Sequence, residues 1–514
     1  MKKINIIIPA AGQATRLRPL SNNQSKAMVR VNGKPCIDFI LEKVSNEAEV
    51  AEVVIVDGAF NDIREYTSRR WSRMNITYAK QEKLTGPRDA IQIGAMLLKD
   101  TSIPTVVWLG DAIILEEELP LGTDFLLTKN VSDHHNWCMW DVMNNSFHDK
   151  PNETRPNAVA LVGLYSFSDT VRMMSAFVES AGEYDISSAL SKYGNRFEKV
   201  VTDEWYDIGE ISSYYKTCAS LLSLKSRAFN KITYDSELNL VHKQPDYHNI
   251  EAIQTIESER IWYRELDWRQ QLFVPRFIDN NNALTLSYEP GLLLSDILMY
   301  EDLPLSTWEY IIDKIFHVIN SYFHHSGHRA GHGGGESVYT FSTNCKMIWV
   351  DKTERRLVET GFTREVKDQV INYAHEIYRK SLPVECMHGD LHFGNILYNA
   401  QNDKIALIDP RGEYGTLTGT MGDNVYDWAK LAQDLVLGYN HLLADIPYTR
   451  QEDIARIFKR MCKKYSVDYD LAVKGGAVLL ATCVPLHADN VMRQQRFEER
   501  VNEYFSDKSS FHSL

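Results

Sequence analysis

Residues 6–17 read Ile-Ile-Ile-Pro-Ala-Ala-Gly-Gln-Ala-Thr-Arg-Leu, a short apolar run that leads into a loop of small residues and then a basic side chain. A continuously apolar run of this length is typical of a strand buried on both faces of a sheet. Similar runs follow at 53–56 and 106–109, and apolar residues between them have helical spacing over 36–44 and 90–98. This alternation predicts parallel strands with helices on both faces of the sheet. A ligand is then expected at the carboxyl ends of the strands, where Gly12, Gly110 and Asp111 fall.

The composition narrows the class of protein. A chain of 514 residues exceeds what one hydrophobic core usually supports, so more than one domain is expected. The net charge of −13, with acidic and basic residues interspersed, argues against nucleic acid and favours small-molecule substrates as partners. Seven scattered cysteines without a C-x-x-C pair predict neither a disulfide framework nor a zinc site and favour a reducing cytoplasm. We see no signal peptide and no apolar run near the roughly 18 residues of a membrane span, so no membrane insertion is expected.

The alternation of strands and helices fades after residues 205–209 and a helix predicted over 214–224. We therefore place a boundary near 225–230 and expect two domains, 1–225 and 226–514. Beyond the boundary the patterns predict two strands within 231–243 joined by a turn at 234–236, a helix over 253–266, a strand over 283–288 and mostly helix after 295.

A glycine- and histidine-rich segment lies at 327–335, directly after His324 and His325. No carboxylate or cysteine joins these histidines at the spacing of metal ligands, so a lid or linker is favoured over a metal cluster.

The tail contains a second informative stretch. Residues 387–397 read Met-His-Gly-Asp-Leu-His-Phe-Gly-Asn-Ile-Leu, and residues 407–411 read Leu-Ile-Asp-Pro-Arg. Phosphoryl transfer from ATP needs a carboxylate that orients the accepting hydroxyl and oxygen ligands that hold Mg²⁺ across the phosphates. Asp390, Asn395 and Asp409 supply that set.

This stretch resembles the choline kinase and aminoglycoside phosphotransferase family, whose catalytic loop has the form H-G-D-x-H-x-x-N and whose next strand ends in an aspartate. The resemblance implies a C-terminal protein-kinase-like α+β domain. In it Asp390 is the catalytic base, Asn395 and Asp409 are ligands of Mg²⁺, and His388 braces the loop.

The same resemblance extends more weakly over residues 226–514. It implies that Lys243 contacts the phosphates of ATP and that Glu259 pairs with it, with Glu257 as the alternative. Glu289 belongs to the segment that meets the adenine. The hairpin around 226–232 lacks the glycine expected there and so should contact phosphate less closely. Asp423 and Asp427 match a segment that supports the active site.

The head resembles the sugar-phosphate nucleotidyltransferases. The resemblance rests on Ala10-Ala11-Gly12, Thr15-Arg16-Leu17, Ser25-Lys26-Ala27-Met28 and Gly33-Lys34-Pro35. It implies a Rossmann-like, GT-A-like mixed sheet within an α/β chain. The loop Ala10, Ala11, Gly12 would cradle a triphosphate, and Arg16 and Lys26 would be the catalytic cations. Ala14 departs from the pattern, because the family usually has a second glycine there.

Further motifs follow in the family's order. The resemblance assigns Asp111 and Asp207 to Mg²⁺ and places Gln81 and Gly86 beside the nucleobase. It assigns the acceptor to Lys150, Asn157 and Gly163. With five such motifs in order, a nucleotidyltransferase is the favoured function of the head.

A kinase makes a phosphomonoester and a nucleotidyltransferase consumes one. The favoured interpretation is a bifunctional enzyme that phosphorylates a small hydroxyl compound with ATP and then transfers a nucleotidyl group from a second NTP, CTP or UTP, giving NDP-X. Fusion would raise the local concentration of the intermediate. Such products feed surface glycan assembly, in capsule or lipopolysaccharide, and X is favoured to be a sugar or polyol.

Two alternatives stay open. One is a choline or ethanolamine kinase joined to a cytidylyltransferase, which would need an aromatic cage for the cation. The other is a chain in which one half is inactive and regulatory, for which Ala14 and the glycine-free hairpin would be the evidence. The nucleobase, the acceptor and the oligomeric state, monomer or homo-oligomer, are not determined by the sequence.

Overall fold

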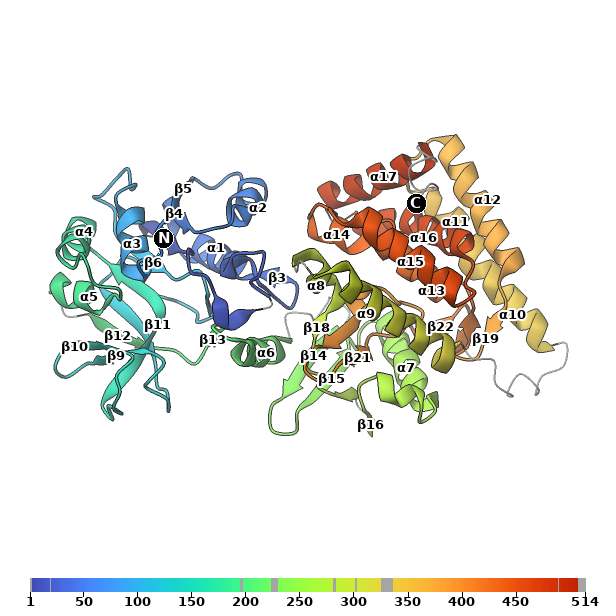
Figure 1. Ribbon diagram of the computed structural model, residues 1–514, viewed down its shortest axis with the longest axis horizontal. Coiled ribbons are helices and arrows are strands. Elements are labelled where there is room, and N and C mark those ends of the chain that lie inside the picture. Colours follow the sequence, from blue (N-terminus) through green and yellow to red (C-terminus); the bar gives the residue numbers. More distant parts are fainter. Residues whose placement is uncertain are drawn as a thin grey trace. The chain divides into compact units, whose positions relative to one another are not determined.

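A computed structural model describes residues 2–18, 20–194, 197–222, 230–280, 283–300, 303–324, 336–488 and 490–506. The chain divides into two compact units, Met1–Leu221 and Leu222–Leu514 (Figure 1). The segment 327–335, His325 and most of the hairpin predicted around 226–232 lie outside the described residues. Each unit is described by itself.

The first unit is built on a mixed sheet in the order β10-β9-β11-β6-β1-β4-β5. Its parallel half consists of β6 (Thr105–Trp108), β1 (Lys3–Pro9), β4 (Glu49–Asp57) and β5 (Ile76–Lys80). Its antiparallel half consists of β11 (Ala158–Phe167), β9 (Cys138–Asp141) and β10 (Ser146–Asp149). β8 (Phe125–Lys129) pairs with β11 and with β12 (Glu198–Val201).

Helices cover both faces of the parallel half because the side chains of β1 alternate between two cores. Ile6 and Ile8 pack with α1 (Cys36–Glu47), whereas Ile7 packs with α3 (Pro87–Ala95). The remaining helices of this unit are α2 (Asp62–Arg70), α4 (Thr170–Glu179), α5 (Ser187–Tyr193) and α6 (Ile211–Ser220).

The alternation of strands and helices in the sequence predicts more parallel strand pairing than this sheet contains. No α-helix is found between residues 109 and 157, all of which the structure describes. Parallel neighbours need a crossover connection, usually a helix, so these strands join the sheet antiparallel instead. The mixed sheet expected from the family resemblance is therefore the arrangement found.

The second unit begins with an antiparallel sheet in the order β14-β15-β17-β16. Its strands are β14 (Asn230–Asp235), β15 (Leu240–Pro245), β17 (Ala283–Ser287) and β16 (Phe277–Asn280), and α7 (Ile250–Glu265) packs against it. The turn predicted at 234–236 lies later, at 236–239. Asp235 accepts hydrogen bonds from the backbone N–H groups of Glu237 and Leu238, and Asn239 has a φ of +55°.

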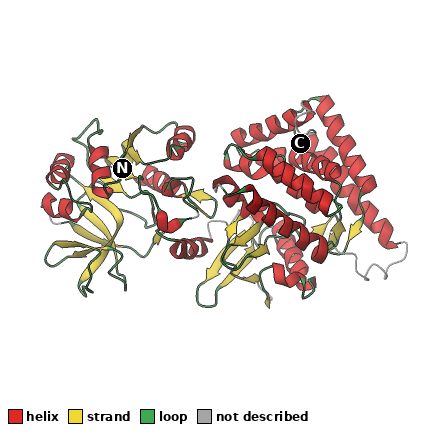
Figure 2. Cartoon of the chain, in the orientation of Figure 1, coloured by secondary structure: helices red, strands yellow, loops and turns green. Residues whose placement is uncertain are grey.

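The rest of this unit is mostly helical (Figure 2). A three-stranded sheet of β18 (Leu292–Leu293), β20 (Ile396–Asn399) and β21 (Lys404–Leu407) joins the two parts. The helices are α8 (Leu294–Tyr300), α9 (Leu305–Val318), α10 (Glu336–Lys346), α11 (Lys352–Leu357), α12 (Arg364–Lys380), α13 (Tyr426–Leu435), α14 (Tyr439–Ala444), α15 (Gln451–Lys464), α16 (Tyr469–Cys483) and α17 (Val491–Ser506).

One helical stretch is longer and more apolar than expected from the sequence. Tyr469–His487 has 19 residues and a mean hydropathy of 1.3, which suffices by length and composition. However, 67% of this stretch is buried inside the unit, where α16 packs against α13 and α12. A core helix passes the same test, because burial in protein selects the same apolar side chains as burial in lipid.

Candidate active sites

The loop after β1 lies at the point where three parallel strands end. The N–H of Ala10 donates to the carbonyl of Val56 on β4, and the N–H of Gly110 donates to the carbonyl of Pro9. Gly58 permits this packing, since a Cβ there would lie 2.5 Å from the carbonyl oxygen of Ala11. Gly12 is exposed, and a Cβ on it would meet no atom of the described residues within 4 Å. The loop therefore has room for a ligand above its backbone.

Lys26 and Asp111 form the central ion pair of this site, with Nζ 2.5 Å from Oδ2. Burial by itself raises the pKa of the Asp111 carboxyl, but the ammonium of Lys26 and, more weakly, Arg16 outweigh it and lower the pKa below its usual value. Both cations assigned from the sequence thus act on this carboxylate.

Asp207 is brought to the same place by a short antiparallel pair. β13 (Trp205–Asp207) pairs with β7 (Ala112–Ile114), and Asp207 lies opposite Ala112, the residue after Asp111. The charges of Asp111, Lys26 and Asp207 all act on the buried thiol of Cys36 below them. Two carboxylates and a lysine therefore gather at one end of the sheet.

Ala14, where the sequence departs from the family pattern, lies in a left-handed turn. Ala14 has φ 47° and ψ 40°, the left-handed conformation that glycine adopts most easily. The hydroxyl of Ser21 donates to the Ala14 carbonyl at 2.7 Å and helps to hold this turn. Ala14 therefore adopts, at a cost in strain, a conformation that glycine would adopt more easily.

The residues assigned to the nucleobase lie together. The amide Nε2 of Gln81, which follows β5, donates to the carbonyl of Gly86 at 3.0 Å, and Gly86 has a φ of +101° at the start of α3. The residues assigned to the acceptor are less gathered. Gly163 accepts a hydrogen bond from Leu109 at the end of β6, but Lys150 and Asn157 are exposed. Among the described residues, neither forms a hydrogen bond or ion pair with Lys26 or Asp111.

In the second unit, the catalytic loop assigned from the sequence is held by the buried carboxylate of Asp427 on α13. Asp427 accepts hydrogen bonds from the backbone N–H groups of His388 at 2.9 Å and Gly389 at 2.8 Å, and from Nε2 of His324 at 3.0 Å. His388 Nε2 lies 3.0 Å from the carbonyl oxygen of Ile408, which links the loop to the end of β21. The loop is therefore fixed from two sides.

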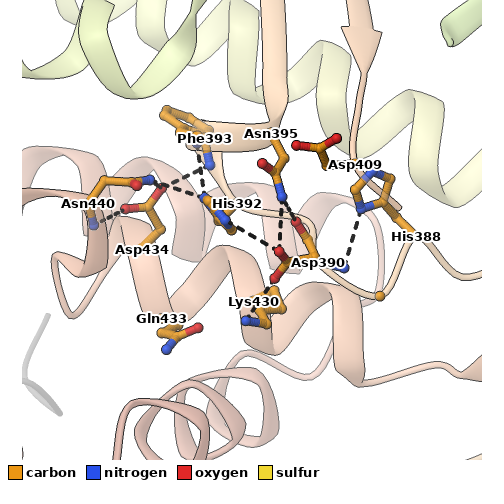
Figure 3. A network of polar contacts seen from close by, with 12 residues as sticks. His388, Asp390, His392, Phe393, Asn395, Asp409, Lys430, Gln433, Asp434 and Asn440 are labelled. Carbon is orange, nitrogen blue, oxygen red and sulfur yellow. Dashed lines mark hydrogen bonds and ion pairs between the residues drawn. The ribbon is translucent and has the colours of Figure 1, made fainter. Parts of the chain in front are cut away.

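Asp390 is the centre of a network of polar contacts (Figure 3). Lys430 Nζ lies 2.9 Å from its Oδ1, and the amide nitrogen of Asn395 donates to its Oδ2 at 3.0 Å. His392 Nε2 lies 3.7 Å from Oδ2. Burial by itself raises the pKa of Asp390, but Lys430 and His392 outweigh it and hold the pKa well below the usual value. The carboxylate is thus ionised and oriented, as a group that accepts a proton must be.

Lys430 was not found by sequence reasoning. It lies 40 positions after Asp390 on α13, all of whose residues are buried, and no local sequence pattern distinguishes it from a surface lysine. Only the packing of α13 below the loop brings the two side chains together.

Lys243 on β15 and Glu259 on α7 form a buried ion pair, with Nζ 2.6 and 2.8 Å from the two carboxylate oxygens. Glu257, the alternative partner, pairs with Arg260 instead. Lys243 Nζ also lies 3.6 Å from Oδ1 of Asp409. Residues far apart in the sequence therefore meet at one point, with a cation held beside a carboxylate that is 58% exposed.

Glu289 lies apart from these groups. Its carboxylate pairs with Lys404 of β21 at 2.8 Å and accepts a hydrogen bond from Ser287 at 3.3 Å. These contacts fix the segment between β17 and β18, where the sequence predicts the adenine contact.

Both sites have the donor types that suit Mg²⁺. Asp111 and Asp207 in the first unit, and Asn395 and Asp409 in the second, offer the oxygen ligands that this ion prefers. Within the described residues no cluster of three or more histidine, cysteine or acidic side chains forms a metal cage.

Comparisons with known proteins find similarity in the first unit. Residues 5–126 and 142–223 match the family described as nucleotidyl transferase. A UTP–glucose-1-phosphate uridylyltransferase of Haloferax volcanii is 26% identical over 221 residues, which cover 40% of this chain and 90% of the relative. UTP–glucose-1-phosphate uridylyltransferase 2 of Staphylococcus saprophyticus is 25% identical over 268 residues, which cover 42% of this chain and 91% of the relative. These matches support a nucleotidyltransferase in the first unit.

Solved structures are also similar to this chain. A UDP-glucose pyrophosphorylase complexed with UDP-glucose has 20% sequence identity and a TM-score of 0.37, and the similarity covers 43% of this chain and 99% of that one.

Proposed function

We propose that the protein is a bifunctional enzyme. The second unit phosphorylates a small hydroxyl compound with ATP, and the first unit joins the resulting phosphate to a nucleotidyl group from CTP or UTP, releasing pyrophosphate and giving NDP-X. The relatives named above use UTP and glucose 1-phosphate, which favours UTP and a sugar phosphate for the first unit. A cytoplasmic location and a role in surface glycan assembly go with this proposal.

In the first unit, backbone donors of the loop Ala10–Gly12 and the side chains of Arg16 and Lys26 bind the triphosphate. Lys26 is already held next to Asp111 by the ion pair, so its ammonium is fixed before the substrate arrives. Mg²⁺ held by Asp111 and Asp207 would neutralise phosphate charge during in-line attack.

In the second unit, Asp390 receives the proton of the accepting hydroxyl. Lys243, oriented by Glu259, binds the phosphates of ATP. Asn395 and Asp409 would hold Mg²⁺, which supplies charge neutralisation across those phosphates. The observation that carries this part of the proposal is the meeting of Lys243, Glu259 and Asp409, since their contacts join three separate segments at one point.

The test is a pair of isosteric variants of the full chain. Asp390→Asn should abolish ATP-dependent phosphorylation of the acceptor while pyrophosphate release from NTP and supplied X-phosphate continues. Asp111→Asn should have the opposite effect. Pyrophosphate release is followed with CTP, UTP, GTP and dTTP against a panel of free and pre-phosphorylated acceptors. Loss of both reactions in either folded variant would contradict the assignment of one reaction to each unit.

A further inference from the structure

Cationic side chains from three separate elements gather around the phenol of Tyr426, which also interacts with Asp390. They are Lys352 and Arg356 of α11, Arg411 after β21, and Lys430 of α13. Arg411 Nη1 donates to the hydroxyl of Tyr426 at 2.9 Å, and its guanidinium lies over that ring at 5.9 Å from the centroid. Lys430 contacts Asp390 directly. Tyr426 connects these groups, since Lys352, Arg411 and Lys430 all act on its phenol.

Lys352 is the cation of this group with the fewest protein contacts. Across the described residues it forms no hydrogen bond or ion pair with a protein group, although it is half-buried. Burial lowers the pKa of its ammonium to about 8. Tyr426 acts to raise this pKa, and the positive charges of Arg411, Arg356 and Lys430 act to lower it. A buried cation that faces other cations is costly unless an anion joins it.

The carboxylates next to these cations do not neutralise all of their positive charge. In the described part of the chain, Arg411 pairs with Glu413 at 3.1 Å and Lys430 pairs with Asp390. Glu413 is 40% exposed, so water screens its charge. Asp390 is needed for the hydroxyl of the acceptor. Positive charge therefore remains in excess around Tyr426, which interacts with Asp390.

The position of the group relative to the other site residues decides what it binds. Lys430 lies below Asp390 on α13, whereas Asp409 lies on the other side of Asp390 (Figure 3). Asp409 and Lys243 mark the side that we assign to ATP. Lys430 is thus placed for the acceptor rather than for the nucleotide, and Lys352 and Arg411 interact with the same phenol of Tyr426 as Lys430 does.

We infer that the acceptor of the second unit is a small hydroxyl compound that carries an anionic group, such as a sugar acid or hydroxy acid, held by Lys352 and Arg411 while its hydroxyl meets Asp390. This inference rests on the proposed kinase function and specifies its substrate class. In the reaction the hydroxyl oxygen forms a bond to the γ-phosphorus and the bond from that phosphorus to the bridging oxygen of ADP breaks. The hydroxyl proton passes to Asp390. A quaternary ammonium such as choline would lie among like charges and is disfavoured.

The experiment measures ATP-dependent phosphorylation by the full chain with matched acceptors. The acids are glycerate and glucuronate, the phosphates are glycerol 3-phosphate and glucose 6-phosphate, the neutral compounds are glycerol and glucose, and the cations are choline and ethanolamine. We expect kcat/KM for an anionic acceptor to exceed that of its neutral counterpart at least about tenfold, because one hydrogen bond to a charged group contributes that much. The carboxylate and phosphate arms identify which anion is used.

Variants of Lys352 test whether this side chain binds the anionic group of the acceptor. Lys352→Gln should lower kcat/KM for the anionic acceptor roughly 10- to 100-fold, mainly through KM, and leave the KM for ATP unchanged. Lys352→Arg should retain most of the activity. Arg355→Gln is the matched control, since it removes an exposed cation from the same helix. Thermal unfolding of each variant checks that the fold is intact.

The outcomes separate this inference from the function on which it rests. Phosphorylation of choline or a neutral compound as efficiently as of any anion, lost in Asp390→Asn, would overturn the inference and leave the kinase in place. An unchanged KM for the anionic acceptor in folded Lys352→Gln would also overturn it. If no compound is phosphorylated and Asp390→Asn consumes ATP at the same rate as the parent, both the kinase and the inference are wrong.

Discussion

Replacing Asp427 by asparagine should both destabilise the second unit and misplace its catalytic loop. The buried carboxylate accepts three hydrogen bonds, two from the backbone N–H groups of His388 and Gly389 and one from His324. Asparagine has nearly the same volume, but its one oxygen cannot serve all three donors, and its NH₂ group faces at least one of them. One lost charge-assisted hydrogen bond together with one buried donor left without a partner costs about 3 kcal/mol.

This loss corresponds to a fall in Tm of roughly 6–12 °C for a unit of this size. Calorimetry and chemical unfolding of the full chain measure it, and phosphorylation should decrease with Asp427→Asn while pyrophosphate release from supplied X-phosphate continues. The control is Asp470→Asn, which makes the same chemical change at an aspartate that is 59% exposed and pairs with Lys474. Exposed pairs contribute about 0–1 kcal/mol. If Asp427→Asn is no less stable than this control, the loop does not depend on the buried carboxylate.

Three further predictions concern separate positions. Ala14→Gly should stabilise the first unit by roughly 1 kcal/mol in urea unfolding, because φ is +47° there, and a loss of stability would show that the turn is not strained. Gly412→Ala should destabilise the second unit and lower phosphorylation, because φ is +67° and a Cβ would lie 2.2 Å from the carbonyl oxygen of Ser258 on α7; a variant as stable and active as the parent would refute this. Burial lowers the pKa of His441 to about 4. Between pH 6.5 and 4 the unfolded chain therefore binds a proton at His441 that the folded unit does not bind, and the free energy of unfolding should decrease as the pH falls through this range. The loss is roughly 3 kcal/mol and should be absent in His441→Phe, measured by unfolding at each pH.

The local elements of this chain could be predicted from the sequence. The apolar runs around Ile6, Val54 and Val107 form the strands β1, β4 and β6, and the helical spacing of residues 36–44 corresponds to α1. Helical and strand periodicity reports which face of an element is buried, and these segments are long and regular enough for that signal to be clear. The boundaries were less well predicted, as the turn at 236–239 shows, because turns depend on side-chain hydrogen bonds such as those of Asp235.

Hydrophobic periodicity could not predict which strands pair antiparallel. A short apolar run is equally compatible with either direction of pairing, so β11 looks like a buried parallel strand in the sequence. Its direction follows from the connections before it, which contain no crossover helix.

The sequence by itself determined the chemical inventory of this protein: a small-residue loop with Lys26 and Asp111 in the head, and Asp390, Asn395 and Asp409 in the tail. Such sets are visible because each lies in a short motif at a strand end. Only the tertiary structure decided that Lys430 contacts Asp390 and that Lys352 joins the same group of cations. These contacts span 40 residues or more, and no local periodicity encodes them. They arise because the buried helices α13 and α16 must pack their apolar faces together, and that packing sets which charged side chains face the catalytic loop.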